Sequence, residues 1–160
     1  MDRDISSAVS AARAFFEGGR ARPLGYRREV LRRLEAEIAR RRDELLDALA
    51  RDLGKPAMEA YFAEVRFSID EIRAARRSLP WWARPHRASG GMLNFPSRCW
   101  SVPEPYGVAL IVAPWNYPIG LILAPLASAL AAGNCTVLKP SELAPASAAA
   151  VRRLIEETLE

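Results

Sequence analysis

The chain has 160 residues, of which 50% are hydrophobic and 26% charged, and 23 Lys and Arg against 19 Asp and Glu give a formal net charge of +4. This is the composition of a globular domain and excludes a disordered or collagen-like chain. Cys99 and Cys135 are too few for a disulfide framework and lack the spacing of a zinc site, so we expect no metal. His86, the one histidine, lies among Trp, Arg and Pro residues, which argues against a catalytic triad. The charged start, Met1 to Asp4, does not resemble a secretory leader.

The first half of the chain predicts three helices. Ile5–Glu17 forms a short helix that ends at two glycines. Tyr26–Leu53 has apolar residues at helical spacing and charges of both signs three and four apart, which predicts one long amphipathic helix on the surface. Pro56–Leu79 has a similar apolar face and forms the third helix.

A basic stretch follows, in which five arginines between Arg73 and Arg87 alternate with Trp81, Trp82 and His86. Such a pattern can bind nucleic acid through phosphate contacts and stacking. The alternative is a helix end with solvated arginines, followed by a crossing with packed tryptophans. The small net charge and the lack of a binding motif favour the alternative, so we expect no nucleic-acid partner.

Prolines and glycines then interrupt the regular pattern between residues 80 and 96. Cys99–Val102 predicts a short strand, and the extended Leu93–Phe95 is its expected partner.

Residues 105–138 contain no charged side chain, a length that raises a membrane span as a hypothesis. Four prolines and the polar group at 115–117 argue against it, and we expect no membrane contact. Gly107–Ala113 instead predicts a strand buried on both faces, Ile119–Ala132 a helix and Cys135–Lys139 a second strand. A last helix runs from Pro145 to Glu160. The crossover rule makes the two strands of this β-α-β-α unit parallel.

The end of the chain adds a further expectation. The last turn of the final helix contains Glu156, Glu157 and Glu160, whose charges oppose the helix dipole, and no glycine caps it. Two parallel strands alone would also leave apolar surface and sheet edges open. We therefore expect the chain to be the front part of a longer protein, a truncated α/β fold.

Two polar clusters follow the two predicted strands, at the edge where open α/β sheets bind ligands. After the first strand, the amide of Asn116 can donate to a developing oxyanion. After the second, Lys139 can reach a phosphate or ribose hydroxyl and Glu142 can accept hydrogen bonds from a ribose diol. The alternatives are a helix cap for Asn116 and a surface ion pair for Lys139 and Glu142. No phosphate-binding glycine motif is present.

The segments Pro105-Tyr-Gly-Val-Ala-Leu-Ile-Val-Ala-Pro-Trp-Asn-Tyr-Pro118 and Ala131-Ala-Gly-Asn-Cys-Thr-Val-Leu-Lys-Pro-Ser-Glu142 resemble the start of the cofactor domain of aldehyde dehydrogenases, in the family's order and spacing. Upstream, Asp52-Leu-Gly-Lys-Pro-Ala-Met-Glu-Ala-Tyr61, with Phe95-Pro-Ser97, is similar to the class 3 branch, which includes fatty-aldehyde and coniferyl-aldehyde enzymes. The resemblance covers nearly the whole chain and is weakest before residue 25.

This resemblance implies a Rossmann-like fold and oxidation of an aldehyde to a carboxylic acid, through a thiohemiacetal and a thioester on a cysteine, with NAD as cofactor and NADP as the alternative. It implies that Asn116 is the catalytic oxyanion donor, that Lys139 and Glu142 lie around the adenine ribose, and that Tyr117 lies on the substrate side. The cofactor-binding positions that it implies are Ile111, Ala113, Pro114, Trp115, Lys139, Ser141 and Glu142. A carboxylate at Glu142 favours NAD over a cofactor with a 2′-phosphate.

The resemblance also implies what is missing, because the family's nucleophile and general base match no residue of this chain. Cys135, at the start of a buried strand, is expected to be inert, and so is Cys99. We expect residues 1–88 to be a helical part of the cofactor domain, 89–104 a β segment of the oligomerisation region, and 105–160 the start of the cofactor-binding domain. Its relatives imply a cytoplasmic homodimer acting on aldehydes. The other hypothesis is a catalytically inactive interaction or nucleotide-binding module.

Overall fold

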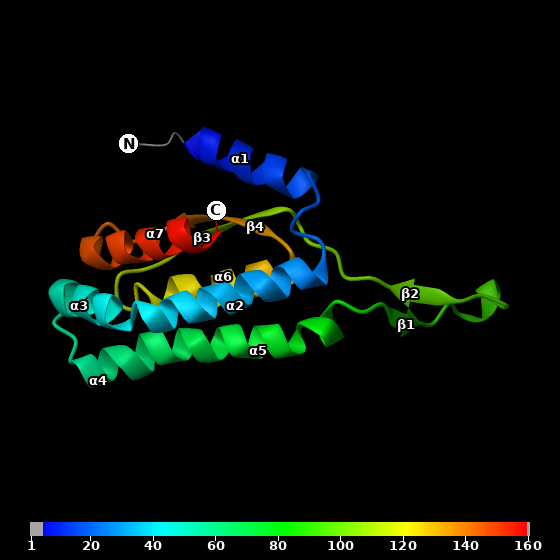
Figure 1. Ribbon diagram of the computed structural model, residues 1–160. Helices are drawn as coiled ribbons and strands as arrows, with labels where there is room; N and C mark the ends of the chain where they lie inside the picture. Colours follow the sequence, from blue (N-terminus) through cyan, green and yellow to red (C-terminus); the bar gives the residue numbers. More distant parts are fainter. Residues whose placement is uncertain (1–4, 160) are drawn as a thin grey trace.

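A computed structural model describes residues 5–159 of the chain. Met1 to Asp4 and Glu160, the predicted last residue of the final helix, lie outside the described residues. A body of packed helices surrounds a small parallel sheet, and a thin β hairpin projects from it (Figure 1). The predicted fold class, a helical layer followed by the first units of a parallel α/β sheet, is confirmed.

The helical layer begins with α1 (Ile5–Glu17), which has the predicted bounds and lies against the sheet. The single long helix expected for residues 26–53 is wrong, because α2 (Leu24–Arg40) and α3 (Arg42–Leu53) are separate helices. The break is at Arg41, where ψ changes to 14°. The Arg41 side chain, 9% exposed, pairs with Glu37 of α2, Glu44 of α3 and Glu157 of α7, so the break is tied to the last helix.

The ion pairs at this break depend on pH. Hydrogen bonds from Arg40 and then Arg41 lower the pKa of Glu37 to about 2. A lowered folded-state pKa stabilises the fold above the unfolded-state pKa, and that stability is lost as the pH falls toward the folded-state value. We expect the unfolding free energy of the wild type minus that of Glu37→Gln to be constant from pH 5 to 8 and to shrink between about pH 4.5 and 2.

Urea denaturation of both proteins across this pH range measures the difference. Glu29→Gln is the matched control, because Glu29 pairs with Arg32 on the same helix in a more exposed position, with the two side chains 52% and 57% exposed. A difference between the wild type and Glu37→Gln that stays the same at pH 2.5 and pH 7 contradicts the prediction.

The third predicted helix is divided as well. It consists of α4 (Ala57–Ala60), a π-helical turn (Tyr61–Arg66) and α5 (Phe67–Trp82). α5 continues through Pro80, beyond the predicted end at Leu79. Its arginines are not all solvated, since Arg73 and Arg76 pair with Glu35 on α2 at 2.7 and 3.1 Å.

The projecting hairpin corrects another expectation. β2 (Cys99–Ser101) forms as predicted, but its antiparallel partner is β1 (His86–Ala88) rather than Leu93–Phe95. Met92–Asn94 forms a 3-10 turn at the tip instead. Gly91, with φ 69°, and Pro96 enclose this turn, so the chain reverses where the strand was expected.

The second half has the predicted β-α-β-α order. It contains β3 (Val108–Val112), α6 (Gly120–Ala132), β4 (Cys135–Lys139) and α7 (Pro145–Leu159). β3 and β4 are parallel, with Val108 opposite Cys135 and Val112 opposite Lys139. The residues that precede β3 and β4 are linked by a hydrogen bond, in which Oδ1 of the buried Asn134 accepts the Gly107 N–H at 2.9 Å. At the start of α7, Asp52 from the end of α3 accepts the N–H groups of Ala146 and Ser147 at 3.1 and 2.7 Å.

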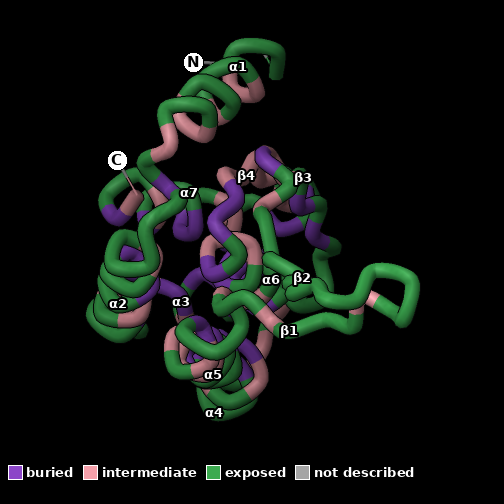
Figure 2. The backbone as a smooth tube through the Cα atoms, turned by 90° about the vertical axis from the view of Figure 1, so that its right-hand side faces the viewer, coloured by how far each residue is buried: buried purple, intermediate pink, exposed green. Residues whose placement is uncertain are grey.

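The hydrophobic core lies where α2, α3, α5, α6 and α7 meet (Figure 2). Its largest fully buried side chains are Leu31, Leu34, Ile38, Leu45, Leu49, Ile72, Leu79, Ile119, Ile122, Leu123, Leu126 and Leu154. The expectation that both faces of the strands are buried is wrong for β3 in this structure. Ile111 faces α6 and is buried, whereas Leu110 and Val112 point the other way and are exposed. Among residues 5–159, no helix is both long and apolar enough to cross a membrane.

Candidate functional site

The two polar clusters predicted from the sequence lie at one edge of the sheet. β3 and β4 are parallel neighbours, and the Ala113 N–H donates to the Lys139 carbonyl at 3.1 Å, just beyond β3. The chain leaves both strands at this carboxyl edge, through residues 114–118 on one side and 140–144 on the other. The register therefore brings together two segments that are more than twenty residues apart in the sequence.

The segment between β3 and α6, residues 115–118, we call the Asn116 loop. Its backbone is held by Lys55, whose Nζ donates to the Asn116 carbonyl at 2.9 Å and lies 3.9 Å from the centre of the Tyr117 ring. Asn116 is exposed, and within residues 5–159 the structure shows no hydrogen bond of its side-chain amide. The loop is thus fixed through its main chain while the amide remains available.

The structure does not support the alternative that Asn116 caps the following helix. The residue at the N-cap position of α6 is Ile119, without a side-chain hydrogen bond. The first N–H groups of the helix donate instead to Glu64, with Oε2 2.9 Å from the Ile119 nitrogen and 3.1 Å from the Gly120 nitrogen. A carboxylate from another helix therefore satisfies the donors that an Asn116 cap would have served.

Lys55 and Glu64 were not singled out from the sequence. Glu64 is fully buried, and its Oε1 lies 2.5 Å from Lys55 Nζ. One signal was available, because Glu64 lies on the apolar stripe formed by Tyr61, Val65 and Ile69, where an acid is unusual. A buried charge needs a partner, but the sequence alone does not say which one.

At the end of β4, Lys139 and Glu142 form the ion pair that was the alternative to a ribose site. Lys139 Nζ and Glu142 Oε2 are 2.5 Å apart, and the side chains are 54% and 76% exposed. The hydrogen bond from Lys139 lowers the pKa of Glu142, which keeps this carboxylate charged. Ser141 is buried, and its Oγ accepts the N–H of Leu143 at 3.2 Å, so it shapes the turn. Exposed pairs of this kind contribute little to stability, so a ligand can replace this contact at small cost.

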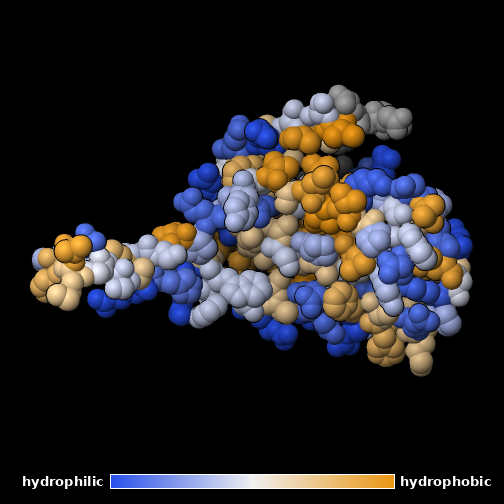
Figure 3. Space-filling model, turned by 180° about the vertical axis from the view of Figure 1, so that it is seen from behind, coloured by the Kyte–Doolittle hydropathy of each residue, from blue (hydrophilic) through white to orange (hydrophobic). Residues whose placement is uncertain are grey.

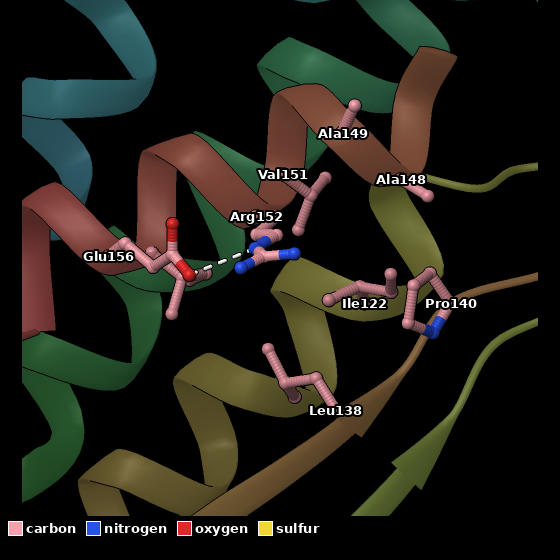
Figure 4. Close-up of a pocket in the computed structure, with 9 residues that line it drawn as sticks. Ile122, Leu138, Pro140, Ala148, Ala149, Val151, Arg152 and Glu156 are labelled. Atoms are coloured by element: carbon pink, nitrogen blue, oxygen red, sulfur yellow. Dashed lines mark hydrogen bonds and ion pairs between the residues drawn. The ribbon is translucent and has the colours of Figure 1, made fainter. Parts of the chain in front are cut away.

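A groove begins beside this pair. It has a volume of about 510 Å³ and runs between the end of β4 and α7. Leu138, Pro140 and Ile122 form one wall, and Val151 and the Arg152–Glu156 pair form the other (Figure 4). These groove residues were not predicted from the sequence, and the one signal for Val151 was the apolar face of α7.

The remaining predicted positions follow the course of β3 and its loop. Ile111 and Ala113 are buried and present mainly backbone at the edge of the sheet, whereas Pro114 is exposed. Trp115 and Tyr117 are 52% and 40% exposed. Residues 114–117 of the first cluster therefore form one short exposed segment, whereas Ile111 and Ala113 are buried beside it.

The two cysteines and the histidine lie outside this edge. Cys135, at the opposite end of β4, is half-buried, and burial raises the pKa of its thiol, which disfavours the reactive thiolate. His86 packs edge-on against Trp81, with ring centres 5.4 Å apart, in the hairpin. No group of three or more His, Cys, Asp or Glu side chains placed to bind a metal occurs within the described residues.

Comparison with known proteins identifies the family. The profile of the aldehyde dehydrogenase family matches residues 1–159, and the chain belongs to this family. It is 38% identical over 93% of its length to 4,4′-diaponeurosporen-aldehyde dehydrogenase of Staphylococcus aureus, and 38% identical over 98% to aldehyde dehydrogenase family 3 member H1 of Arabidopsis thaliana. It covers 32% of each, so the chain spans about a third of the length of these relatives.

Solved structures agree. A substrate-bound Staphylococcus aureus AldH matches 99% of this chain with a TM-score of 0.96 and 36% identity, and the chain covers 35% of it. Two further matches contain cofactor. Pseudomonas syringae AldC with NAD⁺ and octanal has a TM-score of 0.81 at 33% identity, over 97% of this chain and 30% of AldC. GapN of Methanocaldococcus jannaschii with NADP has a TM-score of 0.82 at 28% identity, over 96% of this chain and 32% of GapN.

Proposed function

We propose that the chain forms the first part of an NAD(P)-dependent aldehyde dehydrogenase that oxidises aldehydes to carboxylic acids. One observation supports this most directly. The Asn116 loop is held through its backbone by Lys55, its side-chain amide has no partner within residues 5–159, and it lies at the same sheet edge as Lys139 and Glu142. A neutral donor with a fixed backbone suits stabilisation of charge that develops on a carbonyl oxygen.

Each residue has a role in this proposal. The Asn116 amide donates a hydrogen bond to the aldehyde oxygen as it becomes an oxyanion, and Tyr117 lines the substrate side. Lys139 and Glu142 bind the ribose hydroxyls, to which their exposure gives access, and the groove beside Pro140 accepts the flat base. Ile111, Ala113, Pro114, Trp115 and Ser141 form the wall and turns of the cofactor cleft. NAD or NADP, when bound, supplies the acceptor for hydride. The nucleophilic cysteine and general base belong to chain beyond residue 160.

The proposal also includes three further features. The first is the division of the chain into a helical part, residues 1–88, a β segment, residues 89–104, and the start of the cofactor-binding domain, residues 105–160. The β1–β2 pair joins residues on the two sides of the boundary between the first two parts. A cytoplasmic homodimer is another. The hairpin supports an oligomer, because its projecting tip exposes Met92, Leu93 and Phe95 (Figure 3). The third is an NAD preference, because a 2′-phosphate would meet the Glu142 carboxylate.

The NAD preference predicts the effect of Glu142→Gln. We expect the ratio of kcat/KM with NADP to kcat/KM with NAD to rise roughly fivefold, the equivalent of about 1 kcal/mol for two charges ~4 Å apart in a water-like dielectric. Steady-state kinetics with both cofactors measures the ratio. Glu71→Gln, at an exposed acid of α5, is the control and should leave it unchanged. An unaltered ratio in Glu142→Gln removes this residue from ribose recognition.

The first experiment on the proposal is the intact mass of the protein purified from its own host. A mass near three times 17.7 kDa supports a complete dehydrogenase, and oxidation of aldehydes with NAD or NADP is then assayed directly. A mass of 17.7 kDa, or a long chain without this activity, contradicts the proposal. The alternative of an inactive interaction or nucleotide-binding module then takes its place.

A further inference from the structure

A buried ion pair lies directly behind the Asn116 loop. Glu64 belongs to the π-helical turn Tyr61–Arg66, and both of its carboxylate oxygens are used. Oε1 pairs with Lys55, and Oε2 accepts the Ile119 and Gly120 N–H groups. Single π turns within α-helices are rare and are frequent at functional sites, and here the turn places the carboxylate against the start of α6.

Lys55 completes the arrangement from the other side. Its side chain is 11% exposed, and its ammonium group contacts the Glu64 carboxylate, the Asn116 carbonyl and the face of the Tyr117 ring. Lys55 follows Gly54, which ends α3 in the left-handed conformation with φ 64°. The lysine therefore directly follows a defined helix end, where the Gly54 N–H donates to the Ala50 carbonyl.

The loop is consequently held at two points. Lys55 fixes the Asn116 carbonyl, and Glu64 fixes the first two N–H groups of α6. The carbonyl oxygen of Asn116 and its Cα lie in one rigid peptide plane, so fixing that oxygen, together with the N–H groups that follow at Ile119 and Gly120, limits the movement of the Cα that bears the amide. The positive charge of Lys55 is neutralised by Glu64, so the lysine can hold the loop without presenting an unpaired charge to the site.

We propose that Lys55 and Glu64 are positioning residues that set the direction of the Asn116 side-chain amide. This inference rests on the proposed role of Asn116 in oxyanion stabilisation. A buried ion pair brings little net stability over an apolar replacement, so its presence here is explained by geometry rather than by stability. Displacement of a catalytic group by about 1 Å can cost on the order of 10²-fold in rate.

The test compares Lys55→Met, which removes the charge but retains much of the chain length, with Glu64→Gln, whose amide oxygen can still accept the α6 N–H groups. Arg66→Met is the matched control, because Arg66 is in the same π turn and pairs with Asp70 in an exposed position. In the protein as its host makes it, we expect Lys55→Met and Glu64→Gln to lower kcat about 10- to 100-fold with the NAD Kd unchanged, and Arg66→Met to change neither.

A double-mutant cycle separates positioning from general damage. In the Asn116→Ala background, Lys55→Met should lower kcat less than about twofold, because the amide that it positions is gone. An equal fold loss in both backgrounds overturns the inference, as does a loss that appears in cofactor affinity rather than in kcat.

A second measurement does not depend on activity. Backbone ¹⁵N relaxation reports the order of Asn116 and Tyr117, which should fall in Lys55→Met and remain as in the wild type in Arg66→Met. Unchanged loop order in Lys55→Met overturns the inference whether or not the protein oxidises aldehydes. If the wild type does not oxidise aldehydes but the order of the loop falls in Lys55→Met, the proposed function is contradicted. The inference that Lys55 holds the Asn116 loop is then still supported.

Discussion

Asn116→Ala is expected to lower turnover of aldehydes about 10²–10³-fold, the usual loss when one oxyanion donor is removed. The NAD Kd should remain within about twofold, because the alanine keeps the backbone carbonyl that binds Lys55. The loss arises in kcat since the amide acts on charge that exists only in the transition state. Steady-state and single-turnover kinetics with NAD, together with cofactor titration by fluorescence, measure the two quantities.

Two variants sharpen this expectation. Asn116→Asp has the same shape but no N–H donor, and its negative charge opposes an oxyanion, so it should be at least as slow as the alanine variant. Asn94→Ala changes an asparagine at the tip of the hairpin, where its amide donates to the Gly90 carbonyl at 2.6 Å, and should turn over normally. Equal losses in turnover and cofactor affinity in Asn116→Ala would remove the oxyanion role.

Leu123→Ala is expected to lower the free energy of unfolding by about 2–5 kcal/mol, the cost of a buried leucine together with the cavity that it leaves. Leu123 is fully buried in α6, which lies between the sheet and α5. Destabilising α6 is also expected to disturb the conformation of the Asn116 loop, because the helix begins directly after this loop.

Leu121→Ala is the matched control, since it makes the same change two residues away on the same helix at a side chain that is 39% exposed. Its cost should be below about 1 kcal/mol. Urea denaturation of the 160-residue chain measures both values. Equal costs for the two leucines would contradict the burial on which the described core depends.

Much of the fold follows from sequence pattern because that pattern is local. Gly133 and Pro140 limit α6 and β4, and the apolar runs give the bounds of α1 and β4 correctly. The parallel pairing of β3 and β4 followed from the handedness of the crossover. The class of protein was recognisable from the two motifs at the ends of these strands.

What the sequence did not show depends on contacts between distant residues. At the break, Arg41 pairs with Glu157, more than one hundred residues away, while the local pattern favours one continuous helix. The position of Glu64 on an apolar stripe was visible in the sequence, but the π turn has no composition of its own and the partners of this carboxylate, Lys55 and the start of α6, were not. The partner of β2 was misassigned because the turn at 92–94 was not anticipated.

The segment from Asp52 to Lys55 has a consequence for the order in which the molecule assembles. Asp52 binds the start of α7, and Lys55, three residues later, binds the Asn116 loop, so one short stretch of chain contacts both segments at the carboxyl edge of the sheet. These contacts join residues 61 to 95 positions apart, and closing such distances comes late in folding. Ribosomal synthesis makes the helical layer, with Asp52 and Lys55, before the two loops that these residues contact. A chain that began at residue 105 would retain the sequence of both strands but lack the surface on which their loops take shape.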